Sequence, residues 1–340
     1  MIRALVVRLD NGGDVLLCGP AIRAVALGAD HVTLLCGPRG AQAAALLPEV
    51  DAVIVRRAQW IDPEPRPVFR DDILDDVDHI AAVRASAAVI LTSFHQSPLP
   101  TALLLRMAGV PSIAAISEDY PGSLLDARVR DPGDVHEVQR SLAVAAALGF
   151  VLPATDDERL SVRAADPGVT LPPRFVVVHP GASVPARAWD VDALRELVSV
   201  LQDCGREVVV TGGPDEIALT RAVAGQPRRG VRDLGGRTTL GQLAGVLQRA
   251  DAVVVGNTGP AHLAAAVGTP VVSLFALTVP PERWHPWGVP HAVLNVPVPC
   301  AGCRARTCPV RGHPCLSGVG VGDVVAAVDR LAPRLRVVAA

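Results

Sequence analysis

The chain has 340 residues, a length that corresponds to about two domains of ~100–200 residues each. Half of the residues (50%) are apolar, which is enough for two buried cores and argues against an intrinsically disordered chain. All 32 basic residues are arginine, and with 34 acidic residues they leave a net charge of −2, which argues against a nucleic-acid-binding protein.

No apolar run approaches the ~20 residues that a transmembrane helix requires. The first apolar stretch, Ala4–Val7, is soon interrupted by Arg8, Asp10 and Asp14, which is typical of a folded strand and helix and unlike a signal peptide. We therefore expect a cytoplasmic protein that makes at most peripheral contact with membranes.

Short β-rich apolar runs alternate with Ala/Leu-rich amphipathic stretches, a pattern that predicts βαβ units and parallel sheets. The expected strands are Ala4–Leu9, Val32–Leu35, Ala52–Val55, Ala88–Thr92, Phe175–Val178, Glu207–Thr211, Ala252–Val255 and Pro270–Phe275. The segment Ile61–Asp78 lacks periodicity, so we interpret it as a surface connection.

The fold class expected from this alternation is α/β, with two Rossmann-like doubly wound domains that face each other across a cleft. The first domain covers residues 1–165, and a linker at 166–173 contains three prolines and one glycine. The second domain covers 174–320, followed at 321–340 by a C-terminal helix, Val321–Leu335, and tail.

The turn Asp10–Asp14 follows the first strand, where open α/β sheets bind ligands. Gly12 and Gly13 allow close approach of a ligand to the backbone, and Asp14 lies near a helix start. Asp14 is a candidate helix N-cap and a candidate catalytic carboxylate, and the two roles are compatible because a cap holds a carboxylate in a fixed direction. The glycine spacing differs from the dinucleotide-binding fingerprint, which disfavours a dehydrogenase.

A second polar loop follows the strand that ends at Val255. Thr258 can cap a helix and Pro260 suits its first turn, while Gly268-Thr269-Pro270 ends it. Backbone N–H groups at such a start can bind a diphosphate, and His262 lies in the same turn.

Two more loops follow expected strands. In Thr211-Gly212-Gly213-Pro214-Asp215-Glu216, the acidic residues either complement a helix dipole or accept hydrogen bonds from a ribose. In His179-Pro180-Gly181-Ala182-Ser183 and the residues that follow, Arg187 either binds phosphate oxygens or is solvated.

Taken together, these loops resemble glycosyltransferase family 9, the ADP-heptose:lipopolysaccharide heptosyltransferases, over almost the whole chain. The matching segments are Val6–Leu9 with Gly13–Val15 and Pro20–Arg23, His179–Ser183 with Trp189, Thr211–Pro214, Gly259–Ala266, Gly268–Val272, Phe275, Arg283-Trp284 and a cysteine-rich tail. The resemblance implies a GT-B fold and inverting, metal-independent transfer of a sugar such as heptose from a nucleoside diphosphate sugar such as ADP-heptose. The acceptor is a hydroxyl on a glycan, a lipid-linked sugar or a small metabolite.

The resemblance also implies roles for single residues. It makes Asp14 the general base and Arg187 a donor to the leaving diphosphate. It places Glu216 at the nucleotide ribose and His262 near the diphosphate. The wider set of expected donor-binding residues comprises Gly13, Ser183, Gly213, Glu216, Asn257, Thr258, Gly259, Pro260, Ala261 and His262.

Three positions depart from the family pattern. Asn257 replaces an acidic residue thought to contact the sugar, Arg187 replaces a lysine, and Asp10 with Asn11 replaces serines near the phosphate. Asp10 could raise the pKa of Asp14 or repel a diphosphate if both carboxylates face the cleft. The departures suggest a changed donor or acceptor.

The tail contains Cys300, Cys303, Cys308 and Cys315, with a spacing compatible with a structural zinc site of four cysteines. Reduced or partly oxidised thiols, or another metal, are the alternatives. Cys18, Cys36 and Cys204 are expected to be small buried apolar residues. No cofactor is expected for catalysis. Two other functions stay open: a nucleotide-sugar hydrolase or epimerase of GT-B fold, and a non-catalytic nucleotide-sugar-binding protein.

Overall fold

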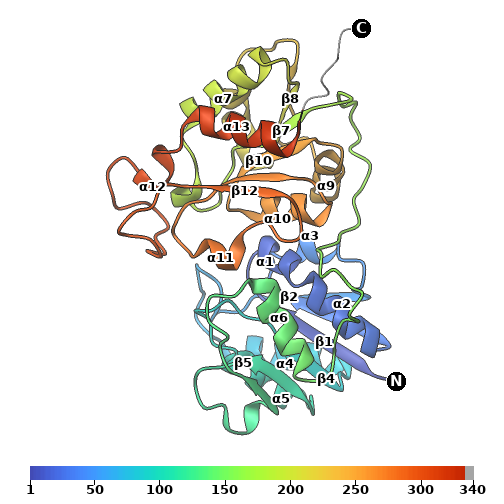
Figure 1. Cartoon of the computed structure of the whole chain (residues 1–340). Helices are drawn as coiled ribbons and strands as arrows, with labels where there is room; N and C mark the ends of the chain where they lie inside the picture. The colour runs from blue at the N-terminus through green and yellow to red at the C-terminus, as the bar shows by residue number, and fades with distance from the viewer. Residues whose placement is uncertain (334–340) are drawn as a thin grey trace. The chain divides into compact units, whose positions relative to one another are not determined.

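The computed structural model describes residues 1–333 and divides into two units, Met1–Ser161 and a second that begins at Val162. Each unit contains a six-stranded parallel sheet flanked by helices (Figure 1). The expected α/β class, with two Rossmann-like doubly wound units, is confirmed. Residues 166–173, the expected linker, lie within the second unit, where Arg249 pairs with Asp166.

The sheet of the first unit has the strand order β3-β2-β1-β4-β5-β6. Its strands are β1 (Arg3–Arg8), β2 (His31–Cys36), β3 (Ala52–Val55), β4 (Ala87–Ile90), β5 (Ile113–Ile116) and β6 (Ala127–Val129). Its helices are α1 (Gly12–Leu17), α2 (Gly19–Gly28), α3 (Ala41–Ala44), α4 (Arg70–Val83), α5 (Leu99–Met107) and α6 (Glu137–Ala146), with a 3₁₀ turn η1 (Gly122–Leu124). The four strands expected in this half are present, whereas β5 and β6 were not expected.

The sheet of the second unit has the strand order β12-β11-β10-β7-β8-β9. Its strands are β7 (Val176–His179), β8 (Val208–Val210), β9 (Val231–Asp233), β10 (Ala252–Gly256), β11 (Val271–Leu274) and β12 (His291–Leu294). Its helices are α7 (Val191–Asp203), α8 (Ile217–Ala224), α9 (Leu240–Gln248), α10 (Gly259–Ala266), α11 (Pro281–Trp284), α12 (Pro314–Ser317) and α13 (Val321–Leu331), with 3₁₀ turns η2 (Pro185–Arg187) and η3 (Pro214–Glu216). The four strands expected here are also present, and β9 and β12 are additional.

Alternating residues of each strand build the core on one face of each sheet. In the second unit, Val176 and Val178 of β7 pack with Leu197 of α7 and Val328 of α13, and all four are buried. In the first unit, Leu5 of β1 belongs to the core cluster that includes side chains of α4 and α5. Strands covered on both faces read as near-continuous apolar runs, which is why the sequence revealed them.

The strand order places a topological switch point in each sheet. In the first unit, successive strands run outward from β1 in one direction and from β4 in the other. In the second unit, β7 and β10 occupy the same positions. Ligands of open α/β sheets bind beyond the carboxyl ends of such strand pairs. The loops after β1 and β4, and those after β7 and β10, are therefore the candidate sites.

Two sequence predictions about helices need correction. The segment Ile61–Asp78 is not a connection throughout, because α4 begins at Arg70. Ile73, Val77 and Ile80 follow helical spacing and pack into the core, but the charged residues between them obscured the period. The final helix ends at Leu331, and the expected tail and the predicted end at Leu335 fall outside the described residues.

Within residues 1–333, none of the helices combines the length and the hydropathy that a bilayer span requires.

Candidate functional site

A buried arginine organises the switch point of the first unit. Arg8, the last residue of β1, is 1% exposed. Its Nε donates to Asp10 Oδ1 at 2.6 Å and its Nη2 donates to Asp10 Oδ2 at 3.0 Å. This two-pronged contact directs the Asp10 carboxylate toward Arg8.

Asp14 is the partly exposed carboxylate of the same group. It lies in the first turn of α1, whose N-cap is Asn11, so the prediction that Asp14 is the N-cap is wrong. Arg8 Nη2 lies 3.3 Å from Asp14 Oδ1, and Asn11 Nδ2 donates to Asp14 Oδ2 at 3.4 Å. The Asp14 side chain is 16% exposed, compared with 8% for Asp10. Gly13 precedes Asp14 in this turn and adds no side chain beside the carboxylate.

The loop after β4 completes the surroundings of Asp10. Ser93 Oγ accepts from Arg8 Nη2 at 2.8 Å and donates to Asp10 Oδ2 at 3.0 Å. Gln96 Nε2 donates to the same oxygen at 3.3 Å. Burial raises the pKa of Asp10, the Arg8 charge opposes this, and the Asp14 charge adds to it. Asp10 is thus held by donors of its own unit, and Asp14 is the more exposed of the two carboxylates.

In the second unit, the Glu216 carboxylate lies between two glycine loops. Glu216 ends η3, and its Oε2 accepts from the Gly213 N–H at 2.7 Å. It also packs against Gly181, where a Cβ would come within 2.0 Å of Glu216 Oε1. Gly181 follows β7 and Gly213 follows β8, so the sheet brings these two sequence motifs to one point.

His179 and Thr211 lie beside the Glu216 carboxylate. His179 Nδ1 is 3.0 Å from Thr211 Oγ1, and His179 Nε2 is 3.8 Å from Glu216 Oε2. Burial lowers the pKa of His179, against the opposing influence of the Glu216 charge. A neutral imidazole with Nδ1 accepting from the Thr211 hydroxyl presents its Nε2–H toward Glu216.

The loops after β7 and β10 also touch. Arg187 ends η2, and its Nη1 donates to the Asn257 carbonyl at 3.4 Å. A Cβ on Gly256 would come within 2.8 Å of the Arg187 carbonyl oxygen, so glycine permits this approach. The structure therefore brings Arg187 to the loop at the start of α10.

The Asn257 amide has a structural use. Its Nδ2 donates to the Ala276 carbonyl at 3.4 Å, and its Oδ1 accepts from the Ala276 N–H at 3.2 Å. A carboxylate could not donate the first of these bonds. Asn257, which stands where the family pattern has an acidic residue, thus connects the loop after β10 to the loop after β11.

The start of α10 partly matches its expected geometry. Thr258 occupies the N-cap position without a side-chain capping bond, and its hydroxyl donates to the Gly256 carbonyl at 3.5 Å. The Thr258 N–H donates to Gly256 and the Ala261 N–H to Thr258, so both amides serve the turn itself. Pro260 has no N–H. Gly259 lies at this helix start, His262 is buried in the first turn, and Ser183 is exposed in the loop after β7.

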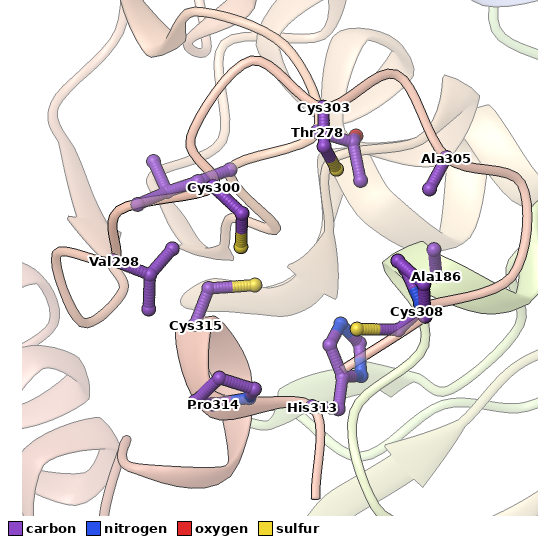
Figure 2. Close-up of a pocket in the computed structure, with 12 residues that line it drawn as sticks. Ala186, Thr278, Val298, Cys300, Cys303, Ala305, Cys308, His313, Pro314 and Cys315 are labelled. Atoms are coloured by element: carbon purple, nitrogen blue, oxygen red, sulfur yellow. The ribbon is translucent and has the colours of Figure 1, made fainter. Parts of the chain in front are cut away.

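The cysteine-rich tail lines one pocket with Ala186, Thr278 and His313 (Figure 2). Cys300, Cys303, Cys308 and Cys315 all border it. In the part of the chain that the structure describes, no three His, Cys, Asp or Glu side chains are grouped as metal ligands. The geometry therefore gives the predicted zinc site no support.

Hydrogen bonds to backbone carbonyls hold the cysteine-rich tail in place. Burial raises the pKa of the Cys315 thiol. The Cys308 thiol donates to the Val310 carbonyl at 3.5 Å, and the Arg306 carbonyl accepts from the Ala186 N–H at 3.0 Å. Backbone contacts thus attach the tail to η2 and the loop after β11.

The three other cysteines partly follow expectation. Cys18 and Cys36 are buried, and burial raises the pKa of Cys18 to about 12 and that of Cys36 to about 11. Both thiols therefore stay protonated at neutral pH and behave as small apolar groups. Cys204, at the end of α7, is only half-buried.

Sequence reasoning missed several polar residues of the first unit. Ser93, Gln96 and Glu137 join the Arg8 group from the loop after β4 and from α6. A charge at the end of an apolar run, as Arg8 follows Ala4–Val7 in β1, was the available signal. Ser93, Gln96 and Glu137 lie 85 to 129 positions from Arg8 in the chain, so spacing could not reveal them.

Comparisons with known proteins show the family to which the chain belongs. The model of glycosyltransferase family 9 (heptosyltransferase) matches residues 84–313. Lipopolysaccharide heptosyltransferase 3 of Escherichia coli K12 is 30% identical over 58% of this chain and 60% of its own length. The chain thus spans about half of the curated relatives it matches, with 47% covered in another Escherichia coli enzyme of the same name.

Solved structures share the fold across both units. The glycosyltransferase family 9 structure from Veillonella parvula has a TM-score of 0.79, with 18% identity and 97% of each chain covered. Escherichia coli heptosyltransferase WaaC, solved with ADP, has a TM-score of 0.72, with 18% identity over 97% of this chain and 100% of that one. These similarities confirm the expected GT-B architecture, and the family match over residues 84–313 covers more than half of the chain. The chain therefore belongs to glycosyltransferase family 9, the heptosyltransferase family.

Proposed function

We propose that this protein transfers a heptose from ADP-heptose to an acceptor hydroxyl, with inversion at the anomeric carbon and without a catalytic metal. The observation that carries the proposal is the Asp14 carboxylate, which lies at the switch point of the first unit on the buried Arg8. Inverting transfer needs one such carboxylate as a general base. Family membership and the names of the relatives support heptose as the sugar.

The proposed step is a single displacement. Asp14 takes the proton of the acceptor hydroxyl while the oxygen of that hydroxyl forms a bond to the anomeric carbon of the sugar. The bond between this carbon and the diphosphate oxygen breaks, and ADP leaves with the electron pair. Arg8 keeps the Asp14 carboxylate oriented, and Asp10 stays on Arg8.

The second unit is assigned to the donor. Glu216 accepts hydrogen bonds from the ribose hydroxyls, with the backbone at Gly213 and Gly181 beside it. Arg187 and the Gly259 N–H stabilise the charge that develops on the diphosphate, the role of fixed donors in sites of this kind. His262 lies in the same helix turn and is assigned a place near the diphosphate.

The acceptor proposed is a sugar hydroxyl of lipopolysaccharide, because the curated relatives carry that substrate in their names. A glycan or lipid-linked sugar of another kind, or a small metabolite such as an aminoglycoside, presents the same chemistry. A cytoplasmic location stays a prediction, and nucleic acid is not among the partners proposed.

The test measures ADP release from ADP-heptose with heptose-deficient lipopolysaccharide, with an aminoglycoside, or with no acceptor. We expect ADP release with the lipopolysaccharide, no effect of EDTA, and a product of opposite anomeric configuration by NMR. ADP release that needs no acceptor would instead identify a hydrolase. Binding of ADP-heptose without turnover in any arm would identify a non-catalytic binding protein, and a product with retained configuration would exclude the displacement above.

The role of Asp14 has its own test. Asp14→Asn removes the base while keeping the size of the side chain. We expect turnover to fall at least ~10²-fold, the scale of general-base catalysis, with little change in the Kd for ADP. Retention of turnover by this variant would assign the base to another group.

A further inference from the structure

A second buried charge lies behind Arg8. Glu137 is the first residue of α6 and is 1% exposed. The helix start is held by a capping box in which the Val138 N–H donates to His136 Nδ1 at 3.2 Å and the His136 N–H donates to Gln139 Oε1 at 3.3 Å. These bonds fix the direction from which Glu137 reaches the first sheet.

Glu137 connects two arginines. Its Oε2 lies 3.5 Å from Arg8 Nη1, and its Oε1 lies 3.2 Å from Arg140 Nε one turn later in α6. Arg140 is 2% exposed and also pairs with Asp131 in the segment before α6. A continuous line of ion pairs therefore runs from Asp131 through Arg140 and Glu137 to Arg8.

A contribution to the free energy of folding is a poor explanation for these buried ion pairs. Removing carboxylates and guanidinium groups from water is costly, and buried ion pairs often contribute no more than apolar residues of similar volume. Burial raises the pKa of Glu137, which records this cost, although Arg8 and Arg140 oppose the shift. What the pairs do provide is a fixed direction for the Arg8 guanidinium, whose opposite edge faces Asp10 and Asp14.

We propose that Glu137 is a positioning residue for the transfer reaction: it anchors Arg8 from inside the first unit, and Arg8 holds Asp14 in the direction required of the base. The inference rests on the proposed function of Asp14. Glu137 touches no reacting atom in this scheme and acts through Arg8. Its negative charge also balances the positive charge of the buried arginine.

The charged and titratable groups that face Arg8 come from three parts of the fold. They are Asp10 and Asp14 from the β1–α1 loop and α1, Cys18 from the junction of α1 with α2, and Glu137 from α6, with Arg140 and Asp131 behind Glu137. Two neutral polar groups, Ser93 and Gln96, face Asp10 from the loop after β4. Removal of Glu137 changes this set by one negative charge.

The test is Glu137→Gln, which keeps the size of the side chain and removes its charge. Turnover is measured with ADP-heptose and heptose-deficient lipopolysaccharide between pH 5 and 9. We expect kcat to fall about tenfold, since small misplacements of a catalytic group are costly, while the KM for ADP-heptose stays the same. The acidic limb of the kcat profile moves to lower pH, because a negative charge near the base is gone. Glu137→Asp, which keeps the charge, restores the position of the limb.

Asp156→Asn is the matched control. It breaks the Arg23–Asp156 ion pair of the same unit, where Arg23 Nη2 lies 2.7 Å from Asp156 Oδ1. This variant should lower the thermal midpoint without changing kcat or the pH limb. If Glu137→Gln does not fold, Arg8→Lys breaks the same connection from the other end while keeping the charge; it should lower kcat by a similar factor, and an unchanged kcat would overturn the positioning role.

The outcomes separate the two proposals. If Asp14→Asn retains turnover, the proposed base is wrong. If Asp14→Asn is inactive while Glu137→Gln changes only the thermal midpoint, as the control does, Glu137 is purely structural and the positioning role is overturned.

Discussion

The contact between Gly181 and Glu216 allows a sharp test of the donor site. In Gly181→Ala, the new Cβ would lie 2.0 Å from Glu216 Oε1 and 2.3 Å from its Cδ, so the carboxylate must leave its position. The φ angle of Gly181 is not positive, so alanine adds no backbone strain there. The variant therefore displaces Glu216 without altering it chemically.

The size of the effect follows from the bonds that the carboxylate would lose. A hydrogen bond to a charged group contributes about 1.5–3 kcal/mol. At about 1.4 kcal/mol per tenfold change, the Kd for ADP should rise by about 10- to 100-fold. Glu216→Ala should cause a similar rise. Both variants lose the same interaction, the contact of the Glu216 carboxylate with ADP. The double variant should therefore bind ADP about as weakly as either single variant.

Isothermal titration calorimetry with ADP measures these constants directly. Gly322→Ala is the matched control, because a Cβ at this α13 position meets no atom within 4 Å and Gly322 also lacks a positive φ. It should leave the Kd for ADP unchanged. The reasoning is refuted if Gly181→Ala binds ADP like the wild type, or if its effect adds fully to that of Glu216→Ala.

Three further predictions address stability and metal content. Because burial lowers the pKa of His179, the unfolded state takes up the proton first as pH falls below about 6.5, and the stability that the neutral imidazole contributes at higher pH is lost. Thermal midpoints at pH 7.5 and 5.5 should therefore differ less in His179→Gln than in the wild type, and equal differences would contradict this reading. Ile80→Ala should cost about 2–5 kcal/mol in urea unfolding, the range for buried aliphatic truncations, whereas a loss below about 0.5 kcal/mol would place α4 outside the core. Protein purified without a metal-affinity step should contain under ~0.2 zinc per chain, and one zinc per chain would restore the Cys₄ hypothesis.

The structure changes how two departures from the family pattern are understood. Asp10, which the sequence suggested could face a ligand beside Asp14, accepts hydrogen bonds from Arg8, Ser93 and Gln96 of its own unit. Asn257 ties two loops through its amide and is used within the protein. Neither substitution by itself requires a different sugar.

The sequence by itself determined the class of fold and the loops that matter. Eight strands were predictable because residues buried on both faces of a parallel sheet must be apolar in sequence. The motifs around Asp14, Gly181, Gly213 and Thr258 were predictable because each follows such a strand, and strand ends of one sheet share an edge. The three-residue strands β6 and β9 escaped because each contains charged residues, and charged residues likewise obscured the period of α4. The four-residue strands β5 and β12 lack such residues and were missed all the same.

Only the tertiary structure decided which side chains meet. Arg8 and Glu137 are separated by 129 positions, and Glu216 reaches Gly181 across two neighbouring strands. Periodicity reports which face of an element is buried, but a polar contact depends on strand order and on the direction of single side chains. For that reason the carboxylates of Asp14 and Glu216 could be suspected from sequence, whereas the groups that orient them could not.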